Sequence, residues 1–96
     1  MNPAKVKRNQ VHQLQDLPNV GPAVASDLEL IGIRSPAQLA GADPLQLYQR
    51  LCRKRGIRQD PCVLDTLISL TRFMGGEKPR PWWAYTAERK RRYGSI

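Results

Sequence analysis

Apolar residues recur every three or four positions along most of the chain, the spacing that places them on one face of an α-helix. The pattern is clearest over residues 61–74, where Asp65, Ser69 and Arg72 fall opposite the apolar face. That apolar face consists of Val63, Leu64, Leu67, Ile68, Thr71 and Met74. No segment alternates apolar and polar residues over several positions, as a half-buried strand would. The pattern predicts an all-α protein.

The predicted helices have recognisable starts and stops. Ser35-Pro36, Asp43-Pro44 and Asp60-Pro61 each combine a capping side chain with a proline suited to the first helical turn. Gly32 and Gly56, and then the Gly75-Gly76 pair, end the segments that precede them. We expect a compact bundle of five or six short helices, over residues 11–16, 22–31, 36–40, 44–55, 61–74 and 82–92.

The charge divides this 96-residue chain, which is short enough for one domain, into unequal parts. A basic N-terminal arm, residues 1–10, carries +3, and residues 11–49 carry −3. Residues 50–96 hold 12 basic and 4 acidic residues, a net +8. The central domain is expected at 11–76, followed by a basic aromatic tail at 77–96 that docks on it. This excess favours a polyanionic partner, of which nucleic acid is the commonest; the alternatives are an acidic protein or solubility.

The stretch LPNVGP, residues 17–22, predicts a tight turn into a helix. Gly21 accepts a positive φ at little cost, and Asn19 is the next most tolerant residue type. Val20 would point inward as an anchor, and Pro22 would open the helix. Backbone N–H groups around Gly21 and Ala23 would then present the positive end of the helix dipole to a phosphate. The candidate phosphate contacts are Asn19, Val20, Gly21 and Ala23.

The run LPNVGPAVASDLELIGI resembles the helix-hairpin-helix motif. The residues that fill its characteristic positions are Leu17, Val20, Gly21, Ala25, Leu28 and Ile31. The resemblance implies that hairpin amides hold the sugar-phosphate backbone without reading base sequence. Asn19 replaces the first hairpin glycine, and Asp27 and Glu29 stand in a helix where DNA-binding members often carry Lys or Arg. A hairpin that only packs two helices is therefore the alternative.

A longer resemblance extends over most of the chain. It runs through LPNVGP, LELIGIRSPAQLAGADPLQLYQRLC, DTLISLTRFM and PWWAYTAERK. These segments resemble small bacterial helix-hairpin-helix proteins labelled as pathogenicity-locus or mitomycin-resistance proteins. The central part is also similar to the C-terminal domain of TfoX-type competence regulators. Neither label implies a mechanism beyond the hairpin.

Two basic clusters are further candidates for nucleic-acid contact. In the first, Gly56 would be the turn of a second, degenerate hairpin; its cations are Arg50, Arg53, Lys54, Arg55 and Arg58. The second lies in the tail and consists of Arg89, Lys90, Arg91 and Arg92. Both could instead be solvated surface.

The tail also carries aromatic residues, which interleave with its cations. Trp82, Trp83, Tyr85 and Tyr93 could stack on bases while the arginines bind phosphates. Alternatively, Trp82 and Trp83 dock the tail on the core. In that case we expect residues 89–92 to be exposed and to contribute little to folding.

Catalysis has little support, so we expect a protein that is not an enzyme. His12 has no nearby nucleophile in sequence, Cys52 falls on an apolar helix face, and Cys62 has no identifiable base. Two cysteines and one histidine do not suffice for a metal site. We expect no metal, no cofactor and no small-molecule substrate.

The expected function is non-catalytic, sequence-independent binding of nucleic acid, DNA in the first place, through backbone phosphates. The alternative is a protein–protein interaction module on a helix-hairpin-helix scaffold that has lost DNA binding. No apolar run approaches the roughly 20 residues of a membrane span. The basic start lacks the apolar core of a signal peptide. We therefore expect a cytoplasmic location and no membrane partner.

Overall fold

Four α-helices and five short 3₁₀ segments make up the computed structural model, which describes residues 2–94 and contains no strand in that range. The α-helices are α1 (Pro22–Leu30), α2 (Pro44–Arg55), α3 (Pro61–Met74) and α4 (Thr86–Tyr93). The 3₁₀ segments are η1 (Pro3–Lys5), η2 (Arg8–Gln10), η3 (Leu14–Asp16), η4 (Pro36–Leu39) and η5 (Trp82–Tyr85). The all-α prediction is confirmed.

The expected number of helices is not confirmed. The segments predicted at 11–16 and 36–40 contain only the 3₁₀ segments η3 and η4. The helix predicted at 82–92 is divided between η5 and α4. A 3₁₀ turn and a single α-turn place apolar residues at the same spacing of three, so the sequence pattern does not separate them.

The predicted caps form at the helix starts. The Asp43 side chain accepts from the Leu45 N–H, and that of Asp60 accepts from the Cys62 N–H, each at 3.0 Å. These bonds with the Cys62 N–H lower the pKa of Asp60. At η4, Ser35 and Gln38 form a reciprocal capping box. Local capping therefore fixes where α2 and α3 begin.

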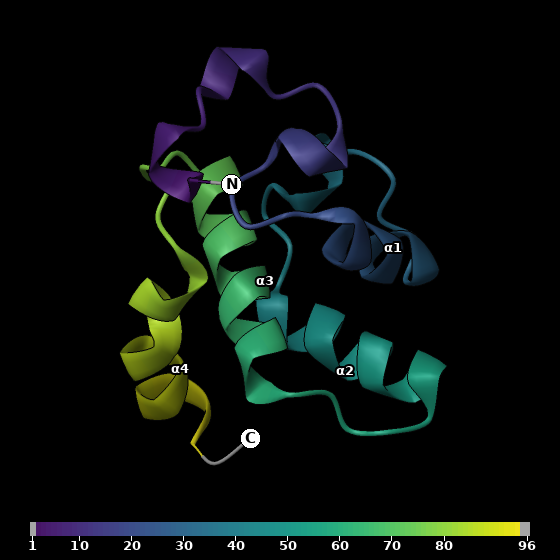
Figure 1. The fold of residues 1–96 in the computed structure, drawn as a ribbon. Helices are drawn as coiled ribbons and strands as arrows, with labels where there is room; N and C mark the ends of the chain where they lie inside the picture. The colour runs from purple at the N-terminus through teal and green to yellow at the C-terminus, as the bar shows by residue number, and fades with distance from the viewer. Residues whose placement is uncertain (1, 95–96) are drawn as a thin grey trace.

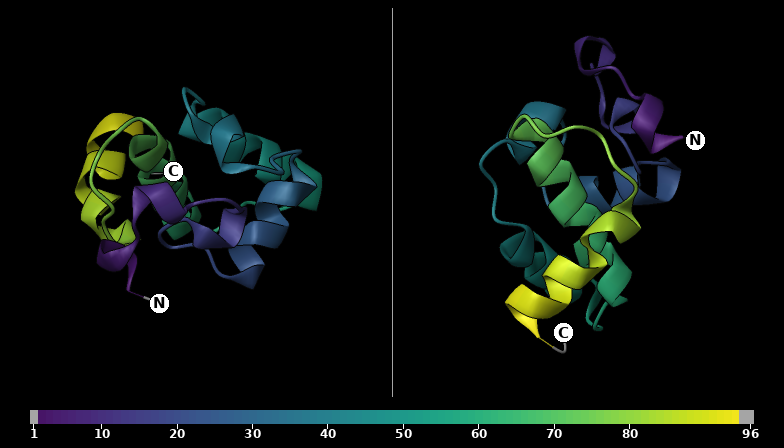
Figure 2. Two further views of the ribbon diagram at one scale, coloured as in Figure 1. Left: turned by 90° about the horizontal axis from the view of Figure 1, so that it is seen from above. Right: turned by 90° about the vertical axis from the view of Figure 1, so that its left-hand side faces the viewer.

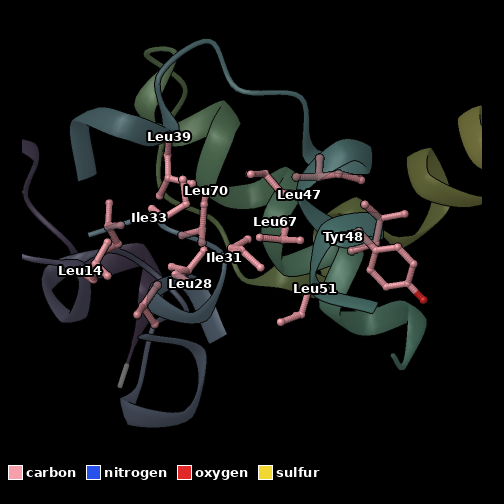
Figure 3. Packing of buried hydrophobic residues seen from close by; sticks show 14 of the residues in the cluster. Leu14, Leu28, Ile31, Ile33, Leu39, Leu47, Tyr48, Leu51, Leu67 and Leu70 are labelled. Carbon is pink, nitrogen blue, oxygen red and sulfur yellow. The ribbon is translucent and has the colours of Figure 1, made fainter. Parts of the chain in front are cut away.

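Helix α3 lies in the centre of the fold, between α2 on one side and α4 on the other (Figures 1 and 2). Every residue from Leu64 to Leu70 is buried. Figure 3 shows core side chains of other segments beside those of α3: Ile33 and Leu39 lie near Leu70, and Leu47 of α2 lies near Leu67. The core is one cluster built around this helix.

The structure corrects the expectation that Asp65 and Ser69 face away from the core. Both are buried, because η5 and α4 pack on the second face of α3. The Asp65 carboxylate is only 1% exposed, and it accepts from Arg89 Nε and Thr86 Oγ1, both at 2.7 Å. Ser69 Oγ donates to the Thr66 carbonyl at 2.6 Å. The tail is thus held by a buried ion pair as well as by apolar contacts.

The N-terminal segment packs against the C-terminal end of α3. Arg8 donates to the carbonyl groups of Phe73 and Glu77 at 2.5 and 2.7 Å. Its guanidinium carbon lies 4.1 Å from the centre of the Phe73 ring. A cation suits a helix C-terminus, where free carbonyl groups carry partial negative charge. Arg8 therefore anchors residues 2–10 to the fold.

The buried pair predicts a large loss of stability when one partner is removed. Replacing Arg89 with Met should lower the free energy of unfolding by about 3–5 kcal/mol, because the Asp65 carboxylate stays buried without its cation. Arg91 is exposed and provides the matched control. Arg91→Met should change the free energy of unfolding by less than about 0.5 kcal/mol. Urea unfolding of both variants measures the difference, and equal effects would contradict this role for Arg89.

Candidate nucleic-acid interface

The turn between η3 and α1 differs from the sequence prediction in its backbone. Gly21 was expected to adopt the positive φ, but its φ is −98° and its ψ is −170°, which is extended backbone. The residue with positive φ is Asn19, at 69°. Asparagine accepts this conformation more readily than other non-glycine residues do. Val20 points inward as predicted and is 1% exposed, so its side chain is not a candidate contact.

The side chain of Asn19 bridges three parts of the chain. Its Nδ2 donates to Ser69 Oγ at 3.1 Å and to the Arg80 carbonyl at 2.8 Å. Its Oδ1 accepts from the backbone N–H of Trp82 at 3.2 Å. A glycine would allow the same turn but none of these bonds. Asn19 is thus a positioning residue that joins the turn to α3 and to the tail.

The N-terminus of α1 carries no side-chain cap. Gly21 occupies the N-cap position, and Pro22 fills the first helical position without an N–H group. The first-turn N–H groups of Ala23 and Val24 have no intrahelical acceptor by geometry. Ala23 is exposed, and a Cβ built on Gly21 would meet nothing within 4 Å. The start of α1 is therefore accessible to an anion.

A hollow of about 310 Å³ lies beside this helix start and is lined by Pro3, Asn19, Gly21, Trp82 and Trp83. The two indole rings meet edge to face, with centroids 5.6 Å apart at 85°. Trp82 is half-buried, whereas Trp83 is 61% exposed. Of the two tryptophans considered as anchors of the tail, Trp82 is therefore the one that is partly buried, and Trp83 is not an anchor.

The buried aromatic anchor of the tail is Tyr85, which is 3% exposed. Burial raises the pKa of its hydroxyl. In the sequence analysis Tyr85 is grouped with the residues that could stack on bases, because the sequence alone does not distinguish a buried aromatic residue from an exposed one beside it. Tyr85 and Arg89 lie four positions apart, and this helical spacing is the signal that could have paired them as anchors.

The acidic residues of α1 are partly compensated by α2. Asp27 forms an ion pair with Arg55, and Glu29 is exposed. At the end of α1, Arg50 donates to the Ile31 carbonyl at 3.2 Å. Two of the predicted phosphate contacts, Arg50 and Arg55, are therefore engaged in holding α1 against α2.

The remaining cations of the first basic cluster lie near the connection between α2 and α3. Gly56 ends α2 with a φ of 70°, as predicted, and the second hairpin around it stays a prediction. Arg53 and Lys54 are exposed. Arg58 hydrogen-bonds the Tyr48 side chain, whose hydroxyl donates to the Gln59 carbonyl at 2.5 Å and has a pKa raised by burial. These bonds hold the loop in place, and the side chains of Arg53, Lys54 and Arg58 remain exposed at this end of α2.

The second basic cluster loses one predicted member. Arg89 is 8% exposed and bound to Asp65, so the expectation that residues 89–92 are all exposed and dispensable for folding is wrong for Arg89. Lys90, Arg91 and Arg92 are exposed on α4. Arg92 also pairs with Glu88 at 3.2 Å. Because α2 and α4 lie on opposite sides of α3, the two basic clusters are separated by that helix (Figure 2).

The described part of the chain offers no candidate metal centre and no membrane span. Residues 2–94 contain no group of three or more His, Cys, Asp or Glu side chains that could hold a metal ion. Cys52 and Cys62 are free, and burial raises the pKa of the Cys62 thiol. None of the described helices is long and apolar enough to cross a membrane.

Comparisons with known proteins give two matches. The profile of the Cdd1 family, described as "Pathogenicity locus", matches residues 7–91. The mitomycin resistance protein McrB of Streptomyces lavendulae is 50% identical over 78 residues, which cover 81% of this chain and 74% of that protein. No solved structure matches. The resemblance to TfoX-type regulators stays a prediction, as does the helix-hairpin-helix motif, whose first helix here is only the segment η3.

The backbone of the turn predicts unequal responses at Asn19 and Gly21. Asn19→Gly keeps the turn but deletes the side-chain bonds to Ser69, Arg80 and Trp82, and should lower the free energy of unfolding by about 1–3 kcal/mol. Gly21→Ala should lower it by less than about 1 kcal/mol, because its φ is ordinary and its Cβ position is open, although alanine is a poorer N-cap residue than glycine. Urea unfolding of both variants provides the comparison. A greater loss at Gly21 than at Asn19 would contradict this description of the turn.

Proposed function

This chain belongs to the Cdd1 pathogenicity-locus family, and we propose that it binds DNA through backbone phosphates, without catalysis and without reading base sequence. The turn at residues 17–22 and the start of α1 would act as the hairpin of a helix-hairpin-helix motif. The observation that carries the proposal is the uncapped, accessible N-terminus of α1 behind a turn that is fixed by Asn19. We extend to this chain, as part of the same proposal, the role in mitomycin resistance that names its relative.

The start of α1 has the chemistry that a phosphate needs. Free N–H groups at a helix N-terminus point along the axis and carry partial positive charge, so they bind anions without a cationic side chain. Gly21 lets a phosphate approach the backbone closely, because no side chain covers it. None of the five residues that line the adjoining hollow is acidic. The nearest negative charge along α1, that of Asp27, is compensated by Arg55.

Exposed cations add an attraction that does not depend on sequence. Among the ion pairs of the described residues, none includes Arg53, Lys54, Lys90 or Arg91. All four side chains are exposed. Arg53 and Lys54 lie in the last turn of α2, and α2 contacts α1. Their neighbour Arg55 pairs with Asp27 of α1, so these two charges are candidates to assist the α1 hairpin.

A protein–protein interaction module is the second candidate function. Ile57 lies in the loop after α2 and is 66% exposed, next to the exposed Arg53, Lys54 and Arg58. An exposed apolar side chain within a basic surface suits an acidic protein partner with an apolar contact residue. On this reading the uncapped start of α1 has no ligand.

Salt dependence distinguishes phosphate binding from other modes. Duplex affinity should fall steeply with salt, with a log–log slope of about −0.9 for each phosphate neutralised. Neutralising Arg53 and Lys54 together (R53Q/K54Q) should reduce the steepness of this slope by up to about two units. Fluorescence anisotropy with two unrelated duplexes measures the slope and the sequence preference. Affinity that ignores salt, or that differs strongly between the duplexes, would contradict the proposal.

The hairpin itself is tested at Ala23. Asp at this early helical position should be tolerated by the fold, since negative charge is favourable at a helix N-terminus. The same charge should repel a phosphate, so Ala23→Asp should weaken DNA binding several-fold, while the neutral isostere in Ala23→Asn should bind more nearly as the parent does. Thermal melts and duplex titrations of both variants provide the test. A folded Ala23→Asp protein with parental affinity would favour the interaction module.

A further inference from the structure

Trp83 and Pro3 both line two hollows at the junction of the N-terminal segment and the tail. The first, of about 310 Å³, includes Gly21 at the start of α1. The second, of about 400 Å³, is lined by Asn2, Pro3, Ala4, Pro81 and Trp83. Residue 83 thus borders open space on the side of the turn and on the side of the N-terminal segment. Figures 1 and 2 show this segment beside the chain that leads into η5.

The Trp83 side chain is not part of the hydrophobic core, so packing in the core does not explain a tryptophan at this position. Trp83 is one of three large hydrophobic residues that are exposed in the described chain, with Leu30 and Ile57. Tyr85 and Arg89 provide the buried contacts of the tail. An indole with this much exposed surface is available to a ligand, and aromatic rings are strong contributors to contact surfaces.

The Trp83 side chain is preorganised by contacts within the protein. Its ring packs edge to face on Trp82, and the Trp82 backbone N–H is bound by Asn19 Oδ1. Two prolines, Pro3 and Pro81, line the hollows and restrict the backbone on both sides. A ligand that stacks here therefore meets a platform whose ordering cost has been met by folding.

We propose that Trp83 stacks on an unpaired nucleobase of a strand whose phosphate lies at the start of α1. This inference rests on the proposed function and defines its ligand: single-stranded DNA, or a duplex with an unpaired end. A base inside a duplex has both faces covered by its neighbours, so an indole reaches the face of a base only where the strand is unpaired.

The surroundings of Trp83 fit this ligand. Neither hollow has an acidic side chain in its lining. The exposed cations Lys5 and Arg80 belong to the two segments that flank the hollows. The Asn19 carboxamide is hydrogen-bonded to Ser69, Arg80 and Trp82. A base bound here would therefore be held mainly by stacking rather than by hydrogen bonds to this side chain. Stacking accepts any base, in keeping with binding that does not read sequence.

The test compares three DNA ligands of about 12 nucleotides or base pairs: a thymidine strand, a blunt duplex, and that duplex with an unpaired thymidine overhang. Trp83→Ala should weaken binding of the strand and of the overhang duplex by about 5- to 150-fold, which corresponds to 1–3 kcal/mol per stacked base. Its affinity for the blunt duplex should change less than about twofold. Trp83→Phe should restore most of the loss, whereas Trp83→Leu, apolar but not aromatic, should not.

Fluorescence supplies a direct readout at the same residue. In Trp82→Phe, Trp83 is the one remaining indole, and its emission should be quenched by the thymidine strand but not by the blunt duplex. Thermal melts of the Trp83 variants should match the parent, because the side chain is exposed. The double variant R53Q/K54Q is the control, and it should weaken all three ligands alike.

The outcomes separate this inference from the proposed function. Blunt-duplex binding by the parent, with Trp83→Ala losing nothing on the strand or losing equally on all three ligands, would overturn the stacking role and leave phosphate binding intact. Absence of binding to all three DNAs would overturn both and would favour a protein partner at this surface. Restoration of binding by Trp83→Leu would show an apolar contact without stacking, which also contradicts the inference.

Discussion

The candidate site depends on the carboxamide of Asn19. It joins the turn before α1 to Ser69 on the central helix and to the backbone of Arg80 and Trp82, across 50, 61 and 63 residues of sequence. These bonds place the two tryptophans beside Gly21, in one hollow. They also engage the polar groups of Asn19, the residue that replaces the first hairpin glycine of the helix-hairpin-helix motif. In the proposed site, contact with a ligand would therefore come from the backbone of residues 21–24 and from Trp83.

The electrostatics of the surface differ from what the net charge of +8 implies. Arg8, Arg50, Arg55 and Arg89 bind carbonyl or carboxylate groups of the fold itself. Arg55 also compensates Asp27, one of the two acidic residues that argued against phosphate binding at α1. Because these arginines serve the fold, the net positive charge is weaker evidence for a polyanionic partner. For the same reason, the acidic residues of α1 are weaker evidence against phosphate binding. Exposed cations outside these contacts, among them Arg53, Lys54, Lys90 and Arg91, are the charges that a polyanion would meet.

Local signals in the sequence predicted the fold where the cause is local. Asp43 and Asp60, each followed by proline, set the starts of α2 and α3, and Gly56 sets the end of α2. The burial of Asp65 could not be read in this way, because it depends on Thr86 and Arg89, more than 20 positions later in the chain. A polar residue opposite an apolar stripe gives the same pattern whether it faces water or a buried partner.

The site was predicted less completely than the fold. The turn and the inward Val20 followed from residue types, but the positive φ was assigned to Gly21 instead of Asn19. Which of Trp82, Trp83 and Tyr85 is buried depends on how η5 lies on α3, and three neighbouring aromatic residues carry no signal for that. The division of the arginines into structural and accessible residues likewise requires the tertiary contacts.

The central claim is that the start of α1 and Trp83 form one DNA-binding surface, and amide chemical-shift mapping tests it most directly. In a ¹⁵N-labelled sample titrated with a short thymidine strand, the amides of Gly21, Ala23 and Val24 and the indole N–H of Trp83 should shift together and saturate at one affinity. Shifts confined to the loop around Ile57 or to α4, with the start of α1 unperturbed, would contradict the claim.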